Sequence, residues 1–369
     1  MLSPRPRPGI LEIVPYVGGK SGGRSAGKPV AKLASNESPL GPSPKAAAAY
    51  RELAGELHRY PDGNCTALRQ ALGRRHNLDP EAIVCGAGSD ELIGLLVRAY
   101  AGPGDEVLYS RHGFLMYPLA ALAAGAHPVA APERDLKADV EALLAHVTSR
   151  TRLVFLANPN NPTGSYLSGT ELARLRAGLP PDVILVIDGA YAEYASDAAD
   201  YDSGHELATT SSNTVMLRTF SKLYGLAALR LGWLTAAPGI VDVMNRVRGP
   251  FNVTMPAQAA GIAALEDEAH ADRARAHNRT WLAWLNEEIA KLGLRAYPSL
   301  GNFLLIEFPA GAGRDAGAAN AWLEARGIIP RQMGGYGLSH CLRISVGLED
   351  ENRRLIEALA GFVSGRAQA

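Results

Sequence analysis

Residues 152–164 read RLVFLANPNNPTG, an apolar run that ends in asparagine, proline and glycine. VILVID at 183–188 and VMLRTF at 215–220 repeat this arrangement, because each leads directly into polar residues. AIVCGAG at 82–88 and EVLYS at 106–110 are earlier runs of the same kind. Runs without polar alternation are typical of strands covered by helices on both faces. The pattern therefore predicts several buried strands of one sheet.

Segments with helical character separate these runs. We expect helices at 45–58, 65–77, 90–101, 136–147 and 168–177. Strands that alternate with helices indicate an α/β fold with a mostly parallel sheet.

The pattern changes near residue 250. The charged segment 266–292 predicts one extended helix, and a final helix is expected at 349–363. Between them lie the apolar runs FLLIEF, GIIPR and CLRISVG, at 303–308, 327–331 and 341–347. The C-terminal third is therefore predicted to form a smaller α+β domain.

Residues 1–30 are rich in proline, glycine and basic side chains, which favours an extended arm packed on another part of the protein. We predict three parts. They are an N-terminal arm with a substrate-lining segment (1–44), a large domain (45–255) and a small C-terminal domain (256–369).

The composition excludes several classes of protein. The 369 residues include 37 basic and 37 acidic side chains, which argues against a nucleic-acid binder that neutralises phosphates. No apolar stretch approaches the about 18 residues of a membrane span, and MLSPRPRPGI has no signal core. We therefore expect a cytoplasmic protein. Cys65, Cys85 and Cys341 are far apart and no HExxH occurs, so we expect neither a disulfide framework nor a metal.

The strand ends carry the candidate chemistry, because ligands of open α/β sheets bind beyond the carboxyl ends of strands. One run ends in NPNNPTG, a second in Asp188 with Tyr191 three residues later, and a third in Ser221 and Lys222. AIVCG leads into AGSDE. Each ending alone is compatible with turn chemistry, whereas four in order favour a shared site.

The ordered set NPNNPTG, IDGAYAEY and RTFSKLYGLAALRLGW resembles the fold type I pyridoxal-phosphate aminotransferases. The similarity extends from KLASNESPLGPSP through RYPDG to LRISVG. Within that superfamily the chain is most similar to the histidinol-phosphate aminotransferases, and aromatic aminotransferases of the same branch are closely related. The resemblance implies a large domain that binds pyridoxal 5'-phosphate, a smaller α+β domain and an N-terminal arm.

The resemblance also implies catalytic roles. Lys222 matches the amine that forms an imine with the cofactor's aldehyde and then carries a proton as base and acid. Asp188 matches the carboxylate that keeps the cofactor's ring nitrogen protonated. Tyr191 and Asn161 match residues that hydrogen-bond the cofactor's phenolic oxygen. The alternatives are a surface lysine, a helix N-cap, and residues of the core or of a turn.

Further positions match cofactor-binding residues of that family. Phe114 corresponds to an aromatic that stacks on the ring, although many relatives have tyrosine there. The implied phosphate ligands are the amides of Ser89 and Asp90 together with Thr219, Ser221 and Arg230. Tyr60 resembles a tyrosine that reaches the cofactor phosphate of the neighbouring subunit, which implies a homodimer.

The substrate must be held by a group that binds anions. Arg343 in LRISVG lies where this family places that arginine, and Arg331 matches a second arginine that faces a substrate phosphate. The remaining implied substrate contacts are Tyr16, Asn36, Glu37 and Asn161. For Arg331 and Glu37, a surface salt bridge is the competing interpretation.

We therefore expect a transaminase that interconverts histidinol phosphate and 2-oxoglutarate with imidazole acetol phosphate and glutamate. The nearest alternative acts on phenylalanine, tyrosine or prephenate. A second alternative is a decarboxylase of the same fold, such as a threonine-phosphate decarboxylase. A non-catalytic regulator is disfavoured, because a scaffold has no need of Lys222, Asp188, Asn161 and Arg343 together.

Overall fold

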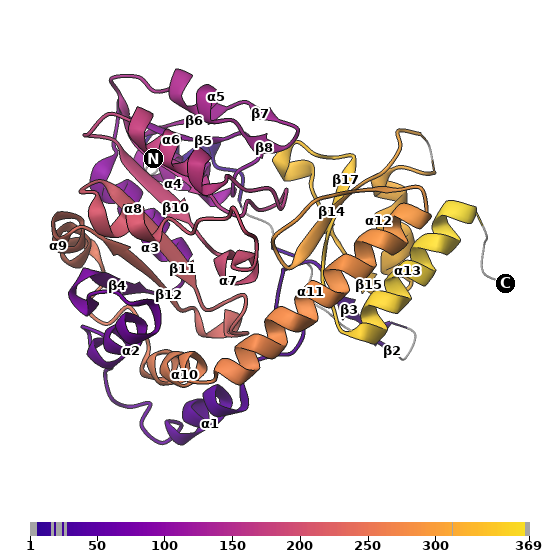
Figure 1. The fold of residues 1–369 in the computed structure, drawn as a ribbon, viewed down its shortest axis with the longest axis horizontal. Coiled ribbons are helices and arrows are strands. Elements are labelled where there is room, and N and C mark those ends of the chain that lie inside the picture. Colours follow the sequence, from indigo (N-terminus) through magenta and orange to yellow (C-terminus); the bar gives the residue numbers. More distant parts are fainter. Residues whose placement is uncertain (1–5, 16–17, 20–23, 26–27, 312, 366–369) are drawn as a thin grey trace, which may run out of the picture.

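The computed structural model describes residues 6–15, 18–19, 24–25, 28–311 and 313–365. Figure 1 shows a larger part built around one wide sheet and a smaller part built around β14 (Phe303–Glu307) and β17 (Cys341–Ser345). Helix α11 (Glu268–Lys291) runs from the larger part to the smaller one. The α/β fold predicted from the sequence is confirmed.

The central sheet has seven strands in the order β4-β12-β11-β10-β9-β5-β6. All neighbours are parallel except β12, which is antiparallel to β11 and β4. The strands are β4 (Ile83–Gly86), β5 (Glu106–Ser110), β6 (His127–Ala131), β9 (Thr151–Ala157), β10 (Ile184–Asp188), β11 (Thr214–Thr219) and β12 (Gly232–Ala236). The sequence analysis missed β6 and β12. Strand β6 lies at the sheet edge and is only partly buried, so it lacks the continuous apolar run of a central strand.

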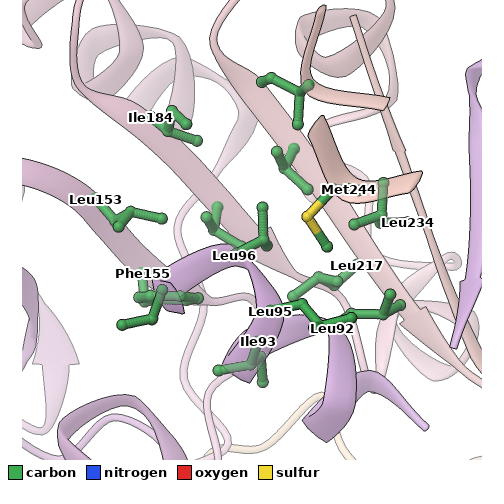
Figure 2. Close-up of a cluster of buried hydrophobic side chains, with 14 of the residues drawn as sticks. Leu92, Ile93, Leu95, Leu96, Leu153, Phe155, Ile184, Leu217, Leu234 and Met244 are labelled. Atoms are coloured by element: carbon green, nitrogen blue, oxygen red, sulfur yellow. The ribbon is translucent and has the colours of Figure 1, made fainter. Parts of the chain in front are cut away.

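Successive residues of the central strands enter different cores. Leu153 and Phe155 of β9 share a core with Leu96 of α3 (Ser89–Tyr100) on one face, as Figure 2 shows. Val154 of β9 enters the core on the opposite face, together with Leu172 of α6 (Gly169–Gly178). Because both faces are covered, these strands need apolar residues at every position.

The helices surround this sheet and its smaller neighbour. Helices α3 (Ser89–Tyr100), α4 (Met116–Ala124) and α9 (Pro238–Val247) contribute to the first core. The opposite face is covered by α2 (Thr66–His76), α5 (Val140–Ala145), α6 (Gly169–Gly178), α8 (His205–Thr210) and α10 (Met255–Leu265). The remaining helices are α1 (Pro44–Glu52), α7 (Ala192–Ala195), α12 (Ala316–Ala325) and α13 (Glu349–Ser364), with short 3-10 turns at Ile10–Glu12, Pro80–Ala82, Ala227–Leu229 and Gly334–Tyr336.

The helix predicted at 136–147 is wrong in its first part. The chain instead forms a hairpin of β7 (Glu133–Arg134) and β8 (Lys137–Ala138), with Asp135 and Leu136 at φ of 51° and 60°. Helix α5 begins only after Asp139, whose side chain accepts hydrogen bonds from the N–H groups of Glu141 and Ala142. This N-cap determines where the helix starts.

The smaller sheet is antiparallel, in the order β13-β14-β17-β16. Its strands are β13 (Arg295–Tyr297), β14 (Phe303–Glu307), β16 (Arg331–Gln332) and β17 (Cys341–Ser345). The N-terminal segment forms a separate two-stranded sheet with the C-terminal third, in which β3 (Ala31–Lys32) pairs in parallel with β15 (Ile328–Ile329). Strands β1 (Arg24–Ser25) and β2 (Lys28–Pro29) form a separate pair.

Helix α10 lies against α1 and α2, and Ala257 and Ala260 share a core with Leu68. The division of the chain into an arm, a large domain and a small domain stays a prediction.

Within the described ranges, no helix is long and apolar enough to cross a membrane. The same residues contain no group of three or more His, Cys, Asp or Glu side chains that could hold a metal ion.

Candidate active site

A cavity of about 280 Å³ lies where β9, β10 and β11 end. Parallel neighbours end at the same edge of a sheet, so Ala157, Asp188 and Thr219 all line it. The sequence-predicted residues that meet here are Asn36, Glu37, Ser89, Asp90, Phe114, Asn161, Asp188, Tyr191, Thr219, Ser221, Lys222, Arg230 and Arg343.

Asp188 is the last residue of β10, and only 4% of it is exposed. Its Oδ2 accepts a hydrogen bond from the Tyr117 hydroxyl (2.8 Å), and its Oδ1 accepts one from the N–H of Ala190 (3.2 Å). Burial raises the pKa of the carboxyl to about 6, although the hydrogen bond from Tyr117 acts to lower it. A buried carboxylate of this kind favours a positively charged N–H partner.

Lys222 follows the end of β11 by three residues. Its Nζ donates a hydrogen bond to the carbonyl oxygen of Ser35 (3.1 Å) and lies 5.7 Å from the centre of the Tyr191 ring. Burial, and next the charge of Arg343, lower the pKa of this amine to about 8. The neutral amine, which is the nucleophilic and basic form, is therefore accessible near neutral pH.

A helix start and an arginine form an anion site in the cavity. Ser89 and Asp90 begin α3, and the first N–H groups of a helix have no partner within that helix. Arg230 donates from Nη2 to Oδ2 of Asp90 (3.1 Å) and from Nη1 to Oγ of Ser221 (3.4 Å). Gly88 has φ of 86°, and a Cβ there would lie 2.5 Å from Nη2 of Arg230. Glycine is therefore needed for the close approach of the guanidinium.

The rest of this anion site comes from β11 and β12. Thr219 is buried, and its Oγ1 accepts a hydrogen bond from the N–H of Ser221 (3.1 Å). Gly232 starts β12, and a Cβ there would lie 2.4 Å from the backbone nitrogen of Ser89. The small residue lets the strand approach the start of α3.

Arg343 lies on β17 and has 6% of its surface exposed. Its Nη1 donates to Oδ1 of Asn161, and its Nη2 donates to the carbonyl oxygen of Ala34 (2.8 Å). Leu342 and Ile344 enter the core of the smaller part, so strand alternation places Arg343 on the opposite face, toward the cavity. Because the Asn161 oxygen accepts from Arg343, its Nδ2 is the atom that can donate to a ligand.

Tyr191 precedes α7 and has 2% of its surface exposed. Its ring lies edge-on to Phe303, with 5.1 Å between the ring centres. The Tyr191 oxygen accepts a hydrogen bond from Nδ2 of Asn36 (2.8 Å). Burial raises the pKa of the hydroxyl, which therefore keeps its hydrogen at neutral pH.

Phe114 lines the cavity and contacts Tyr117 edge-on, with 5.9 Å between the ring centres. The turn before it is anchored at two points. The N–H of His112 donates to Glu133 (3.0 Å), and its carbonyl accepts from Nδ2 of Asn160 (3.2 Å). These bonds hold the aromatic ring at the cavity wall.

Two of the sequence-predicted residues, Tyr60 and Arg331, do not line this cavity. Tyr60 is 81% exposed and stacks on Phe251, with 4.6 Å between the ring centres. Arg331 lines a neighbouring cavity of about 520 Å³. Tyr16 lies outside the described residues.

Arg331 nevertheless lies next to Arg343, since the two are paired across β16 and β17. Directly paired residues of neighbouring strands project from the same face of a sheet. Gly19 lines both cavities, so the two cavities adjoin. Glu37 lines the first cavity and also accepts a hydrogen bond from Nζ of Lys32 (2.9 Å), so the salt bridge considered as an alternative is present.

The sequence analysis missed Tyr117 and Ser345. Tyr117 lies in the apolar helix MYPLAALAA, where nothing distinguishes it from a core aromatic. The Ser345 hydroxyl donates to Oδ1 of Asn36 (3.0 Å). Unlike Tyr117, Ser345 could have been identified from its position in the sequence. It follows Arg343 by two residues, so strand alternation places both on the same face.

These groups fit pyridoxal phosphate. The buried Asp188 carboxylate suits a protonated ring nitrogen, and the Lys222 amine suits an aldehyde. The start of α3 and Arg230, with Gly88 between them, suit a phosphate.

Known proteins resemble this chain along almost its whole length. The family described as "Aminotransferase class I and II" matches residues 28–359. Histidinol-phosphate aminotransferase of Paramagnetospirillum magneticum is 58% identical over 98% of this chain and 99% of its own length. The protein of that name from Rhodospirillum centenum is 55% identical over 99% of this chain and 100% of its own. The crystal structure of histidinol-phosphate aminotransferase from Sinorhizobium meliloti in complex with pyridoxal-5'-phosphate is 32% identical, covers 91% of both chains and has a TM-score of 0.84.

Proposed function

Because the chain belongs to the class I and II aminotransferases, we propose that it transfers an amino group from histidinol phosphate to 2-oxoglutarate, or in the reverse direction. The products are imidazole acetol phosphate and glutamate. The observation that carries the proposal is the placement of Lys222, Asp188 and Arg343 around one cavity. We place the reaction in histidine biosynthesis and, as the sequence predicts, in the cytoplasm.

The family uses pyridoxal phosphate, which supplies an aldehyde and an electron-accepting ring when bound. Asp188 would hold the ring N–H, and Phe114 would cover one ring face. The phosphate would be bound by the backbone N–H groups of Ser89 and Asp90 together with Thr219, Ser221 and Arg230. The phenolic oxygen would accept hydrogen bonds from Tyr191 and Asn161.

Lys222 moves the proton. Its pKa of about 8 lets the amine take a proton from the substrate carbon at neutral pH and return it as an acid. Arg343 favours this exchange, because its positive charge disfavours the ammonium form of Lys222.

Arg343 and Arg331 are suited to hold substrate anions. A guanidinium binds a carboxylate or a phosphate oxygen pair through two parallel hydrogen bonds. We propose that Arg343 binds the carboxylate of glutamate and the phosphate of histidinol phosphate in turn. Arg331, its neighbour on the same sheet face, would add a second contact to the phosphate. Tyr16, Asn36 and Glu37 would line the substrate side of the cavity.

Substrate choice can be tested on the purified protein with its cofactor. Anaerobic titration with histidinol phosphate should convert the cofactor's absorption to that of its amine form at far lower concentration than titration with phenylalanine. Comparable conversion by both would indicate the broader aromatic specificity. Conversion by neither would contradict transamination and favour the decarboxylase alternative.

We also propose that the active unit is a homodimer in which Tyr60 enters the partner's site. Tyr60 is 81% exposed and Phe251, on which it stacks, is 45% exposed. Leu57, nearby in sequence, is 68% exposed. Large apolar side chains that remain this exposed favour contact with another protein.

Mixed dimers test this arrangement. We expect Tyr60→Phe and Lys222→Ala proteins each to have low activity, because each lesion damages both sites of its own dimer. A hybrid of the two would hold one site with both lesions and one with neither, so activity should return after subunit exchange. Confirmed exchange without recovery would show that Tyr60 does not act across the dimer.

A further inference from the structure

Asn36 occupies an unusual position between the two sheets. It is 1% exposed and has φ of 54°, a left-handed conformation that asparagine tolerates. Its backbone carbonyl accepts a hydrogen bond from Nδ2 of Asn302 (3.1 Å). Three residues earlier, the carbonyl oxygen of Leu33 accepts a hydrogen bond from the N–H of Ser345 on β17 (2.8 Å). The segment that carries Asn36 is therefore held by the smaller sheet.

The Asn36 side chain reaches from there to Tyr191. Its Oδ1 accepts a hydrogen bond from the Ser345 hydroxyl (3.0 Å), and its backbone N–H donates to that same hydroxyl oxygen (2.8 Å). Its Nδ2 donates to the Tyr191 oxygen (2.8 Å). Both ends of the amide are thus bound, with Oδ1 facing Ser345 and Nδ2 facing Tyr191.

This arrangement determines the direction of the Tyr191 hydroxyl. An N–H group can only donate, so the Tyr191 oxygen acts as acceptor toward Asn36. The hydroxyl hydrogen must then point to a different partner, and Tyr191 lines the cavity that contains Lys222. We propose that Asn36, held by Ser345, is a positioning residue that makes Tyr191 a hydrogen-bond donor toward the bound cofactor.

The position of the Tyr191 hydrogen affects a pKa that can be measured at the cofactor. The inference rests on the proposed function in one respect, which is that the protein binds pyridoxal phosphate. A hydrogen bond donated by Tyr191 stabilises negative charge on the phenolic oxygen. The phenolic oxygen then stabilises a neighbouring positive charge less. The nitrogen that Lys222 contributes to its bond with the cofactor therefore has a lower pKa. Loss of the Asn36 side chain weakens this bond, so the pKa should rise.

Other charges around this nitrogen stay unchanged in the test. The charged groups that act on Tyr191 and Lys222 are Arg343 on β17, Asp188 on β10, Asp90 on α3, Glu37 in the N-terminal segment and Arg230 after η3 (Ala227–Leu229). The variants below keep all five.

The test is a pH titration of the visible absorption of the protein with its cofactor. Asn36→Gly removes the side chain without left-handed strain and should raise the midpoint by about half a pH unit. Tyr191→Phe should raise it more. The double variant should match Tyr191→Phe alone, because Asn36 acts through the hydroxyl.

Ser345→Ala provides a second variant if Asn36→Gly folds poorly, and it should raise the midpoint by a smaller amount. Asn286→Ala is the control, because this asparagine on α11 donates to a helix carbonyl and should leave the midpoint unchanged. An unchanged midpoint in both Asn36→Gly and Ser345→Ala would overturn the proposal. So would an Asn36→Gly shift that persists in full without the Tyr191 hydroxyl. These readouts need no amino donor, so they remain valid whichever substrate the protein uses.

Discussion

Replacement of Lys222 by alanine is expected to reduce turnover by at least about 10⁴-fold, because it removes both the nucleophile and the proton carrier. No other lysine lines the cavity among the described residues. The fold should survive, since burial already disfavours the charged form of this amine. Single-turnover conversion of histidinol phosphate measures the loss, and thermal unfolding checks the fold.

Two further variants make the Lys222 result specific. Lys222→Arg keeps a positive charge but has no amine of suitable pKa, so it should be equally inactive. Lys291→Ala removes an exposed lysine that pairs with Glu288 on α11, and it should be fully active. Substantial turnover by Lys222→Ala would refute the assignment of Lys222.

Asp188→Asn should lower turnover by about 10³-fold, the second-largest effect that we expect. The substitution keeps the shape and removes the charge that would hold the ring nitrogen protonated. The amide has a single accepting oxygen, so the variant can keep the hydrogen bond from Tyr117 or the one from the N–H of Ala190, but not both. Comparison of kcat and of cofactor affinity between the two proteins measures the loss of the charge together with the loss of one accepted hydrogen bond.

The pH dependence of cofactor binding supports the same test. The pKa of Asp188 is about 6 before the cofactor binds. Below this pH the carboxyl gains a proton and loses its charge, so affinity should fall as the pH drops through about 6. Asp188→Asn should lack this part of the pH dependence. A variant that kept turnover within tenfold, with an unaltered pH profile, would exclude the proposed role.

Much of the site was accessible from the sequence, because its cofactor residues lie where buried strands end. An apolar run such as VILVID indicates a strand covered on both faces, and its last residue, Asp188, then lies at the sheet edge where ligands bind. Lys222 closely follows the next apolar run, VMLRTF, whereas Arg230 was assigned by the resemblance to the aminotransferases. These inferences depend on local order along the chain, which a sequence displays directly.

The partners of these residues were not accessible in the same way. Tyr117 binds Asp188 across 71 positions of sequence, and Ser345 binds Asn36 across 309. The hairpin at Asp135 likewise replaced part of a segment with helical character.

The sequence by itself determined which residue types stand at the strand ends, because apolar periodicity and turn residues act over a few neighbouring positions. Only the tertiary structure decided that Arg331 lies beside Arg343 and that Asn36 reaches Tyr191. Sheet order and strand register bring such residues together. Both depend on how the whole chain buries its apolar surface, which no single segment specifies.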